Sequence, residues 1–164
     1  MARSLLLSLA WLLLLCLAWL WPTAALAADP DAQRLAQDIL TKGAALFDTR
    51  DAAAMASTYT EDAELILFAK DKDTDTYKAQ VTRGRSAIQR GYQDLFKDRK
   101  PGTRSRNVVE FAHFVGTDLL IIHGTFTLDV SQGVSFPFIQ VRAKQGDKWL
   151  LMNLQLFIVK EEAR

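Results

Sequence analysis

The chain has 164 residues, the length of one average domain, and an apolar fraction of 49% excludes an intrinsically disordered chain. Its formal net charge of +1, from 20 basic and 19 acidic residues, argues against a nucleic-acid-binding protein held mainly by positive charge. A single cysteine excludes a disulfide framework, a zinc site of four thiolates and an iron–sulfur cluster.

The first 27 residues differ in composition from the rest of the chain. Their one charged side chain is Arg3, an apolar run extends from Leu5 to Trp21, Pro22 interrupts it, and small residues lead up to Ala27. This arrangement is typical of a secretory signal peptide. We therefore expect cleavage near Ala27 and an exported protein, periplasmic or extracellular. The alternative is an uncleaved membrane anchor, because a run of 17 residues is barely long enough to span a bilayer.

Residues 28–164 form the predicted domain, with 19 basic and 19 acidic side chains and no cysteine. This balance gives no reason to expect nucleic acid as a partner, and no membrane association is expected after signal cleavage. The lack of a thiol excludes cysteine catalysis.

The first half of this domain has the pattern of helices. Apolar residues recur at intervals of three and four from Asp31 to Phe47, which predicts a helix that ends near Asp48. Asp51 is placed to cap a second, short helix that ends near Tyr59.

A hairpin and a third helix are expected next. The apolar residues 64–69 predict a strand, and the polar residues 70–80 predict a loop or hairpin. Ser86, followed three residues later by Gln89, has the spacing of a capping box and predicts the start of the third helix. The basic residues between 97 and 106 are expected to form a solvated turn.

The second half of the domain predicts strands separated by short turns that contain glycine, at residues 104–115, 118–130, 135–144 and 149–159. Such connections favour antiparallel hairpins. Helices followed by a run of strands predict an α+β fold. A curved antiparallel sheet with helices on one face can enclose a cavity for a small ligand.

Three segments carry a likeness to known proteins. Residues 54–63 read Ala-Met-Ala-Ser-Thr-Tyr-Thr-Glu-Asp-Ala, residues 83–88 read Arg-Gly-Arg-Ser-Ala-Ile, and residues 146–151 read Gly-Asp-Lys-Trp-Leu-Leu. In this order they resemble the nuclear-transport-factor-2-like superfamily, in its SnoaL-like and ketosteroid-isomerase-like branch. The resemblance covers nearly all of residues 31–160 and implies a cone-shaped, curved antiparallel sheet covered by three N-terminal helices. Members include isomerases, dehydratases, cyclases, hydrolases and non-catalytic binding or assembly modules, so the fold does not decide the function.

The resemblance also implies where a ketosteroid isomerase would carry its general base, an aspartate about eight positions after the tyrosine that matches Tyr59. Leu67 occupies this position, and leucine cannot abstract a proton. The base of those isomerases is therefore missing, and the sequence leaves open whether the chain is an enzyme.

His123 is the strongest remaining candidate for chemistry, because histidine titrates near neutral pH and this one lies in an apolar strand. In a catalytic interpretation it is the general acid or base of a cofactor-free lyase or isomerase, helped by Tyr59 or Asp62. The alternative is a hydrogen-bonded histidine on a packed strand, which needs no catalytic role.

Polar side chains within apolar segments are candidates for ligand contact. Asn153 and Gln155 share a predicted strand face with Trp149, and Tyr92 belongs to the apolar side of the third helix. Arg142 has the planar fork that binds a carboxylate. The alternatives are an exposed or dimer-facing row for the two amides, and a solvated or ion-paired arginine near its strand end.

The last strand is apolar on both faces, and such a strand must be covered on both. Helices are expected on one face and a second copy of the chain on the other, which predicts a homodimer.

Three functions follow from these patterns. The leading one is an exported domain that binds a small apolar or weakly polar molecule in an apolar pocket, without a cofactor. The others are a lyase or isomerase that uses the strand histidine, and a non-catalytic dimerisation or interaction module. No metal site is expected: Asp71, Asp73 and Asp75 begin like a calcium loop, but Thr76 and Thr82 stand where that loop needs glycine and glutamate.

Overall fold

The computed structural model describes residues 29–71, 74, 76–100, 102–129 and 134–160. The predicted signal peptide, with its cleavage site near Ala27, lies outside the described residues, as do Asp73 and Asp75. The helices are α2 (Pro30–Asp48), α3 (Ala52–Ser57) and α4 (Arg85–Asp98). The strands are β1 (Tyr59–Lys70), β2 (Tyr77–Arg83), β3 (Ser105–Val115), β4 (Leu119–Leu128), β5 (Val134–Gln145) and β6 (Lys148–Lys160).

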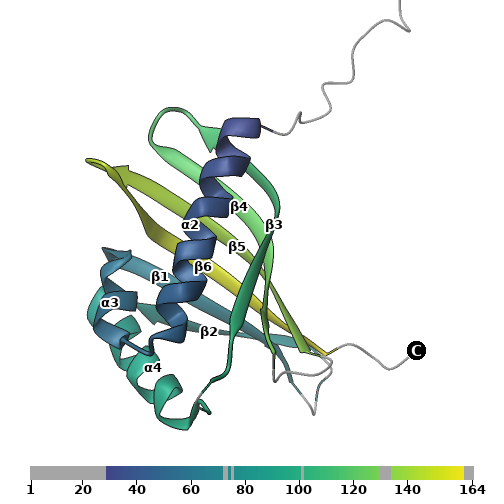
Figure 1. The fold of residues 1–164 in the computed structure, drawn as a ribbon. Helices are drawn as coiled ribbons and strands as arrows, with labels where there is room; N and C mark the ends of the chain where they lie inside the picture. Colours follow the sequence, from purple (N-terminus) through teal and green to yellow (C-terminus); the bar gives the residue numbers. More distant parts are fainter. Residues whose placement is uncertain (1–28, 72–73, 75, 101, 130–133, 161–164) are drawn as a thin grey trace, which may run out of the picture.

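The strands form one curved sheet in the order β2-β1-β6-β5-β4-β3, whose two edges do not meet (Figure 1). Neighbouring strands are antiparallel except β1 and β6, which are parallel. The α+β class and the four C-terminal strands are confirmed, whereas the expectation of a wholly antiparallel sheet is wrong at this pair. The β2 hairpin and α4 carry the chain away from β1, and the meander returns across the sheet to place β6 beside β1 in the same direction.

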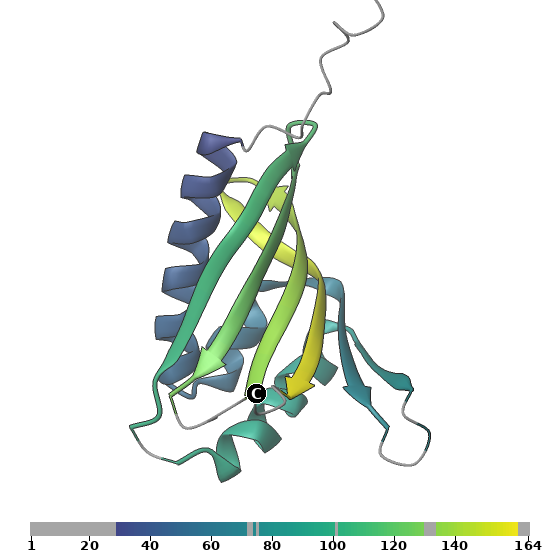
Figure 2. The ribbon, with the colours of Figure 1, turned by 90° about the vertical axis from the view of Figure 1, so that its right-hand side faces the viewer.

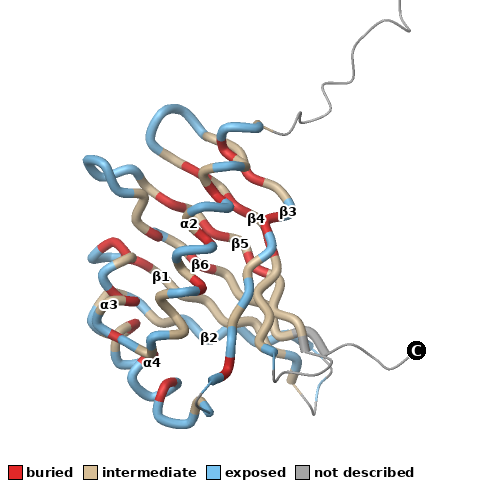
Figure 3. The backbone as a smooth tube through the Cα atoms, in the orientation of Figure 1, coloured by how far each residue is buried: buried red, intermediate tan, exposed pale blue. Residues whose placement is uncertain are grey.

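Helix α2 lies across one face of the sheet against β3, and α3 and α4 lie near β1 (Figures 1 and 2). The buried residues of α2 recur every four positions, and three of them are alanines that bring the helix backbone close to the strand: Ala32, Ala36, Leu40 and Ala44. Exposed and half-buried residues separate them along the helix (Figure 3).

Short-range signals define the starts of the two later helices. Asp51 caps α3 as predicted, because its carboxylate accepts a hydrogen bond from the Ala54 N–H at 2.9 Å. Gly84 takes the cap position of α4 with a φ of +83°, and no side chain caps this end. The capping box predicted at Ser86 is therefore wrong, because the glycine makes the turn from β2 and leaves Ser86 inside the first helical turn.

A bulge in β6 decides which of its residues face the helices. Val141 pairs with Asn153, but the next residue, Arg142, pairs with Leu151, so Met152 has no partner in this register. An extra residue reverses the alternation of faces along a strand. Leu151 is accordingly buried at 3% exposure, whereas Met152 is 36% exposed.

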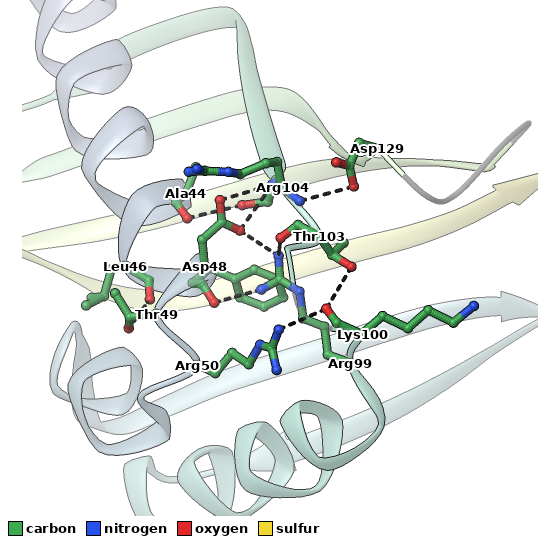
Figure 4. A network of polar contacts seen from close by, with 12 residues as sticks. Ala44, Leu46, Asp48, Thr49, Arg50, Arg99, Lys100, Thr103, Arg104 and Asp129 are labelled. Carbon is green, nitrogen blue, oxygen red and sulfur yellow. Dashed lines mark hydrogen bonds and ion pairs between the residues drawn. The ribbon is translucent and has the colours of Figure 1, made fainter.

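A buried ion pair joins the ends of two helices to the start of β3 (Figure 4). Arg99, which follows α4, donates to the carboxylate of Asp48 at the end of α2. It also donates to the carbonyl oxygens of Phe47 and Thr103, both at 2.7 Å, and lies 4.3 Å from the centre of the Phe47 ring. The backbone N–H of Ser105 donates to the same carboxylate. This part of the basic segment is therefore not the solvated turn expected from the sequence, because Asp48 neutralises Arg99.

The charge state of Asp48 gives this pair a pH dependence. Burial alone would raise the pKa of Asp48, but hydrogen bonds from Arg99 and Ser105 outweigh it and hold the pKa below its ordinary value. The ion pair therefore contributes its full stability above about pH 4, the ordinary pKa of aspartate. That contribution is lost as the pH falls through the lower pKa of the folded protein.

We expect Asp48→Asn to lower the free energy of unfolding by about 3 kcal/mol at neutral pH, because Arg99 stays charged and buried without its partner. The deficit should shrink at about pH 3, which is below the ordinary pKa of aspartate, because the ion pair contributes less stability there. Urea unfolding at both pH values measures this. Asp94→Asn, which breaks an exposed pair with Lys97, is the matched control and should cost less than about 1 kcal/mol. A deficit of the same size at both pH values would contradict the assignment.

Candidate ligand-binding site

A cavity lies between the helices and the face of the sheet that they cover. Its volume is about 830 Å³, within the range of small-molecule sites. Residues of all three described helices and of all six strands except β3 supply most of its wall, and β3 adds one residue, Asn107. Most lining side chains are apolar, including Ile39, Leu67, Phe136 and Phe138.

Phe47 anchors the aromatic part of this wall. Its ring packs edge-on against Tyr92, Phe96 and Phe126, with centroid distances of 6.2, 5.2 and 5.3 Å. These contacts connect α2, α4 and β4, so the wall is fixed from three elements at once.

The charged side chains that line the cavity are all basic. They are Lys42, Lys148 and Arg142, and neither aspartate nor glutamate is found among the lining residues that the structure describes. Lys42 is exposed and paired with Asp38 at 2.6 Å, and Lys148 is also exposed. Arg142 is thus the one buried charge in the described lining.

Arg142 is held at two of its nitrogens. It is 7% exposed; its Nε donates to the side-chain oxygen of Gln140 at 2.9 Å, and its Nη1 donates to the carbonyl oxygen of Trp149 at 3.1 Å. Gln140 is equally buried. Within the described ranges of the chain, no carboxylate forms an ion pair with Arg142, and no hydrogen bond involves its Nη2. A buried guanidinium without an anionic partner is expensive, which marks this position as a candidate site.

Arg142 nevertheless remains charged at physiological pH. Burial lowers its pKa to about 10, and the nearby hydroxyl groups of Tyr59 and Tyr92 oppose this shift. The cavity therefore presents a positive charge in an apolar setting.

Tyr59 and Tyr92 form a hydrogen-bonded pair beside this charge, with their hydroxyl oxygens 2.7 Å apart. Burial raises the pKa of Tyr59 well above its ordinary value, and Tyr92 adds to the effect. Burial also raises the pKa of Tyr92. Both hydroxyls are neutral near pH 7 and cannot balance Arg142. Since one hydroxyl donates to the other, the accepting tyrosine keeps a proton with which it can donate elsewhere.

Solved structures with the same architecture have little sequence identity to this chain. A domain of unknown function with a cystatin-like fold from Nostoc punctiforme PCC 73102 has a TM-score of 0.61 and 17% identity, covering 82% of this chain and 80% of that one. An NTF2-like protein of unknown function from Pseudomonas putida KT2440 has a TM-score of 0.60 and 11% identity, covering 84% and 100%. The chain has the NTF2-like fold.

A third neighbour comes from Xanthomonas campestris and is assigned as a calcium/calmodulin-dependent protein kinase II association domain. Its TM-score is 0.57 with 18% identity, covering 79% of this chain and 89% of that one. No protein-family model matches the sequence, and no curated protein matches it. The fold implied by the resemblance of the three sequence segments is thus confirmed, and the fold alone does not decide the activity.

Four of the predicted site residues line the cavity of this NTF2-like domain: Tyr59, Tyr92, Arg142 and Trp149. Leu67 lines it as well, so the position of the isomerase base faces the cavity with a leucine. The alternative of a solvated or ion-paired Arg142 does not hold, because the β1 and α4 tyrosines and β6 enclose it.

The other four predicted residues are not in the lining. Asp62 is exposed and accepts a hydrogen bond from the Thr60 hydroxyl at 2.9 Å. His123 is half-buried on the face of the sheet away from the helices, edge-on to Phe111 at a centroid distance of 6.1 Å. The structure therefore does not bring His123 and Asp62 to Tyr59 as an acid–base group.

The two amides of β6 lie on this outer face too. Gln155 is the lateral neighbour of Ile139, which is the lateral neighbour of His123. Its amide also donates to the side-chain oxygen of Asn153 at 3.3 Å. The expectation that Asn153 and Gln155 share the face of the cavity residue Trp149 is wrong, because the bulge reverses the alternation between them.

Gln140 is the contributor that the sequence interpretation did not single out. It follows Phe136 and Phe138 at two-residue spacing and precedes Arg142. This alternation was the available signal, since a polar residue that continues an apolar strand face enters a buried environment.

Two classes of site are not found in the described part of the chain. No group of three histidine, cysteine, aspartate or glutamate side chains is placed to hold a metal ion there. None of the helices in those same ranges is long and apolar enough to cross a membrane.

The tyrosine pair can be tested by a double-mutant cycle. We expect Tyr59→Phe and Tyr92→Phe each to lower the free energy of unfolding by about 1–2 kcal/mol, because each leaves the other hydroxyl buried without its partner. The double variant should lose less than the sum of the two, with a coupling of about 1 kcal/mol. Urea unfolding of the four proteins measures the cycle, and additive losses would refute the pairing.

Proposed function

We propose that the protein binds a small, largely apolar molecule in the cavity between its helices and its sheet. The observation that carries the proposal is the cavity of about 830 Å³, with mostly apolar walls and two hydrogen-bonded pairs of polar side chains, Tyr59 with Tyr92 and Arg142 with Gln140. Sites for small molecules have this composition: apolar walls supply affinity and a few polar groups fix the orientation.

The size and apolar character of the cavity support the same conclusion. Protein interiors are close-packed, and voids larger than a water molecule are few. A large apolar cavity loses dispersion contacts along its whole lining, and a ligand of matching shape restores them.

The proposal is for binding rather than for a lyase or isomerase reaction. Leu67 stands on the cavity wall where ketosteroid isomerases carry a base, and His123 and Asp62 are absent from the described lining. We propose further that the protein acts after export, which is supported by the signal-peptide pattern of residues 1–27.

A neutral fluorescent probe, N-phenyl-1-naphthylamine, tests the cavity. We expect its emission to rise on binding the purified protein, and Leu67→Trp to weaken this binding by at least about tenfold, because the larger side chain fills the lining. Val108→Trp places the same residue at a 41%-exposed position of β3 and should leave probe binding unchanged. Equal binding by both variants would show that the probe sits elsewhere.

A second proposal concerns the outer face of the sheet, on which the described helices do not lie. We propose that two copies of the chain associate through this face. Ile66, Gln155, Ile139 and His123 form one lateral row across it, all half-buried. A sheet with apolar residues on both faces needs cover on both. The structural neighbour assigned as an association domain adds support.

Sedimentation measures this association. We expect the mass of a dimer at micromolar concentration, and Ile139→Asp should shift the protein to a monomer, because a charge at the middle of the row would be buried without a partner. Leu95→Asp, at a 52%-exposed position on α4, is the control and should remain dimeric. A monomeric unchanged protein would rule out the association.

A further inference from the structure

We infer that the ligand of the cavity is an amphiphilic monocarboxylate, with its carboxylate on Arg142 and its hydrocarbon part along the aromatic and aliphatic walls. This inference rests on the proposed binding function and names the chemical class of the ligand.

The first support is the charge of the lining. Every charged side chain in the described lining is basic, and the buried one, Arg142, has no acidic partner in the described chain. Buried charges in proteins are normally paired, since an isolated ion loses its hydration without compensation. An anionic group on the ligand supplies the missing partner.

The second support is the way in which Arg142 is held. Gln140 and the Trp149 carbonyl bind Nε and one Nη1 proton, which fixes the plane of the guanidinium. A guanidinium has five N–H groups, so those on Nη2 and the second proton of Nη1 remain for an acceptor. Their adjacent, coplanar directions match the two oxygens of a carboxylate.

The third support comes from the tyrosine pair. Tyr59 and Tyr92 lie close enough to Arg142 to raise its pKa. The tyrosine that accepts the hydrogen bond within the pair keeps a hydroxyl proton that it can donate to a ligand. Both hydroxyls are uncharged near neutral pH, so they add a donor and no competing anion. A carboxylate at Arg142 can therefore accept from the guanidinium and from a phenol.

The number of buried cations selects a single negative charge. Arg142 is the one buried cation of the described lining, whereas Lys42 is exposed and paired with Asp38. A phosphate ester, which carries close to two negative charges at neutral pH, would keep one charge unbalanced among apolar side chains. Most of the remaining wall is apolar and suits an alkyl chain or an aromatic ring.

Three ligands with one alkyl chain test this inference: decanoate, 1-decanol and decyl phosphate. Each is titrated against protein loaded with N-phenyl-1-naphthylamine, and affinity is read from displacement of the probe. We expect decanoate to bind at least about tenfold more tightly than 1-decanol, and more tightly than decyl phosphate.

Variants of two cations, one inside the lining and one outside it, locate the preference. Arg142→Met keeps the length of the side chain and should abolish the preference for decanoate over 1-decanol while the neutral probe still binds, which also shows that the variant is folded. Lys97→Met removes an exposed cation of α4 outside the described lining and should leave the preference intact. A preference that survives Arg142→Met, or is lost in Lys97→Met, would overturn the assignment of Arg142.

The pH dependence supplies an independent readout. Decanoate affinity should be constant from about pH 6 to about pH 9 and should fall as the pH passes about 10, where Arg142 loses its proton in the unliganded protein. Probe binding in the same buffers reports whether the cavity remains intact, since the probe has no charge.

The outcomes distinguish a failure of the carboxylate inference from a failure of the proposed binding function. If the probe and 1-decanol bind as well as decanoate, the cavity binds ligands and the carboxylate inference is wrong. Tighter binding of decyl phosphate would also refute it. If none of the four compounds binds, the proposed function fails, and the inference fails with it.

Discussion

The ion pair between Asp48 and Arg99 joins the end of α2 to the segment after α4 and to the start of β3, and its contacts continue into the wall of the cavity. Arg99 is stacked on Phe47, and the Phe47 ring meets Tyr92 edge-on. Tyr92 in turn shares a hydrogen bond with Tyr59 at the charged end of the cavity. A continuous set of contacts thus runs from a polar cluster at the helix ends (Figure 4) to the hydroxyl pair beside the buried guanidinium. The polar cluster and the cavity wall are therefore connected through Phe47 and Tyr92.

Sequence reasoning succeeded where structure is determined locally. The helix that ends at Asp48, the cap at Asp51 and the glycine turns after β3 and β5 all follow from short-range spacing. It failed where distant segments decide the outcome. No local pattern shows that β6 lies parallel to β1. No local pattern shows either that Arg99 is neutralised by Asp48, which lies 51 residues earlier in the chain. Arg142, near the end of a strand, is buried because other elements close over it.

Only half of the site residues predicted from the sequence line the cavity, for a related reason. A polar residue within an apolar segment faces something other than bulk water, but the pattern does not say on which side of the sheet. Tyr59 and Arg142 face the cavity, whereas His123 and Gln155 meet the same description and lie on the outer face. Leu67 shows the opposite case: the fold keeps the position of a catalytic base while the residue there has no acid–base chemistry. The NTF2-like fold supplies the cavity, and the polar side chains on its wall carry the ligand chemistry that we propose.

The bulge at Met152 has a consequence for comparing chains of this fold. Beyond Met152, the face of the sheet on which a β6 side chain lies depends on how many residues precede it in the strand, and not only on the identity of the residue. A related chain with the same residues but no bulge at Met152 would continue the alternation of Trp149 and Leu151 without interruption. Asn153 and Gln155 would then enter the cavity, and Leu154 and Leu156 would turn outward. Aligned identity along β6 is therefore a weak guide to shared ligand contacts unless the bulge is also shared.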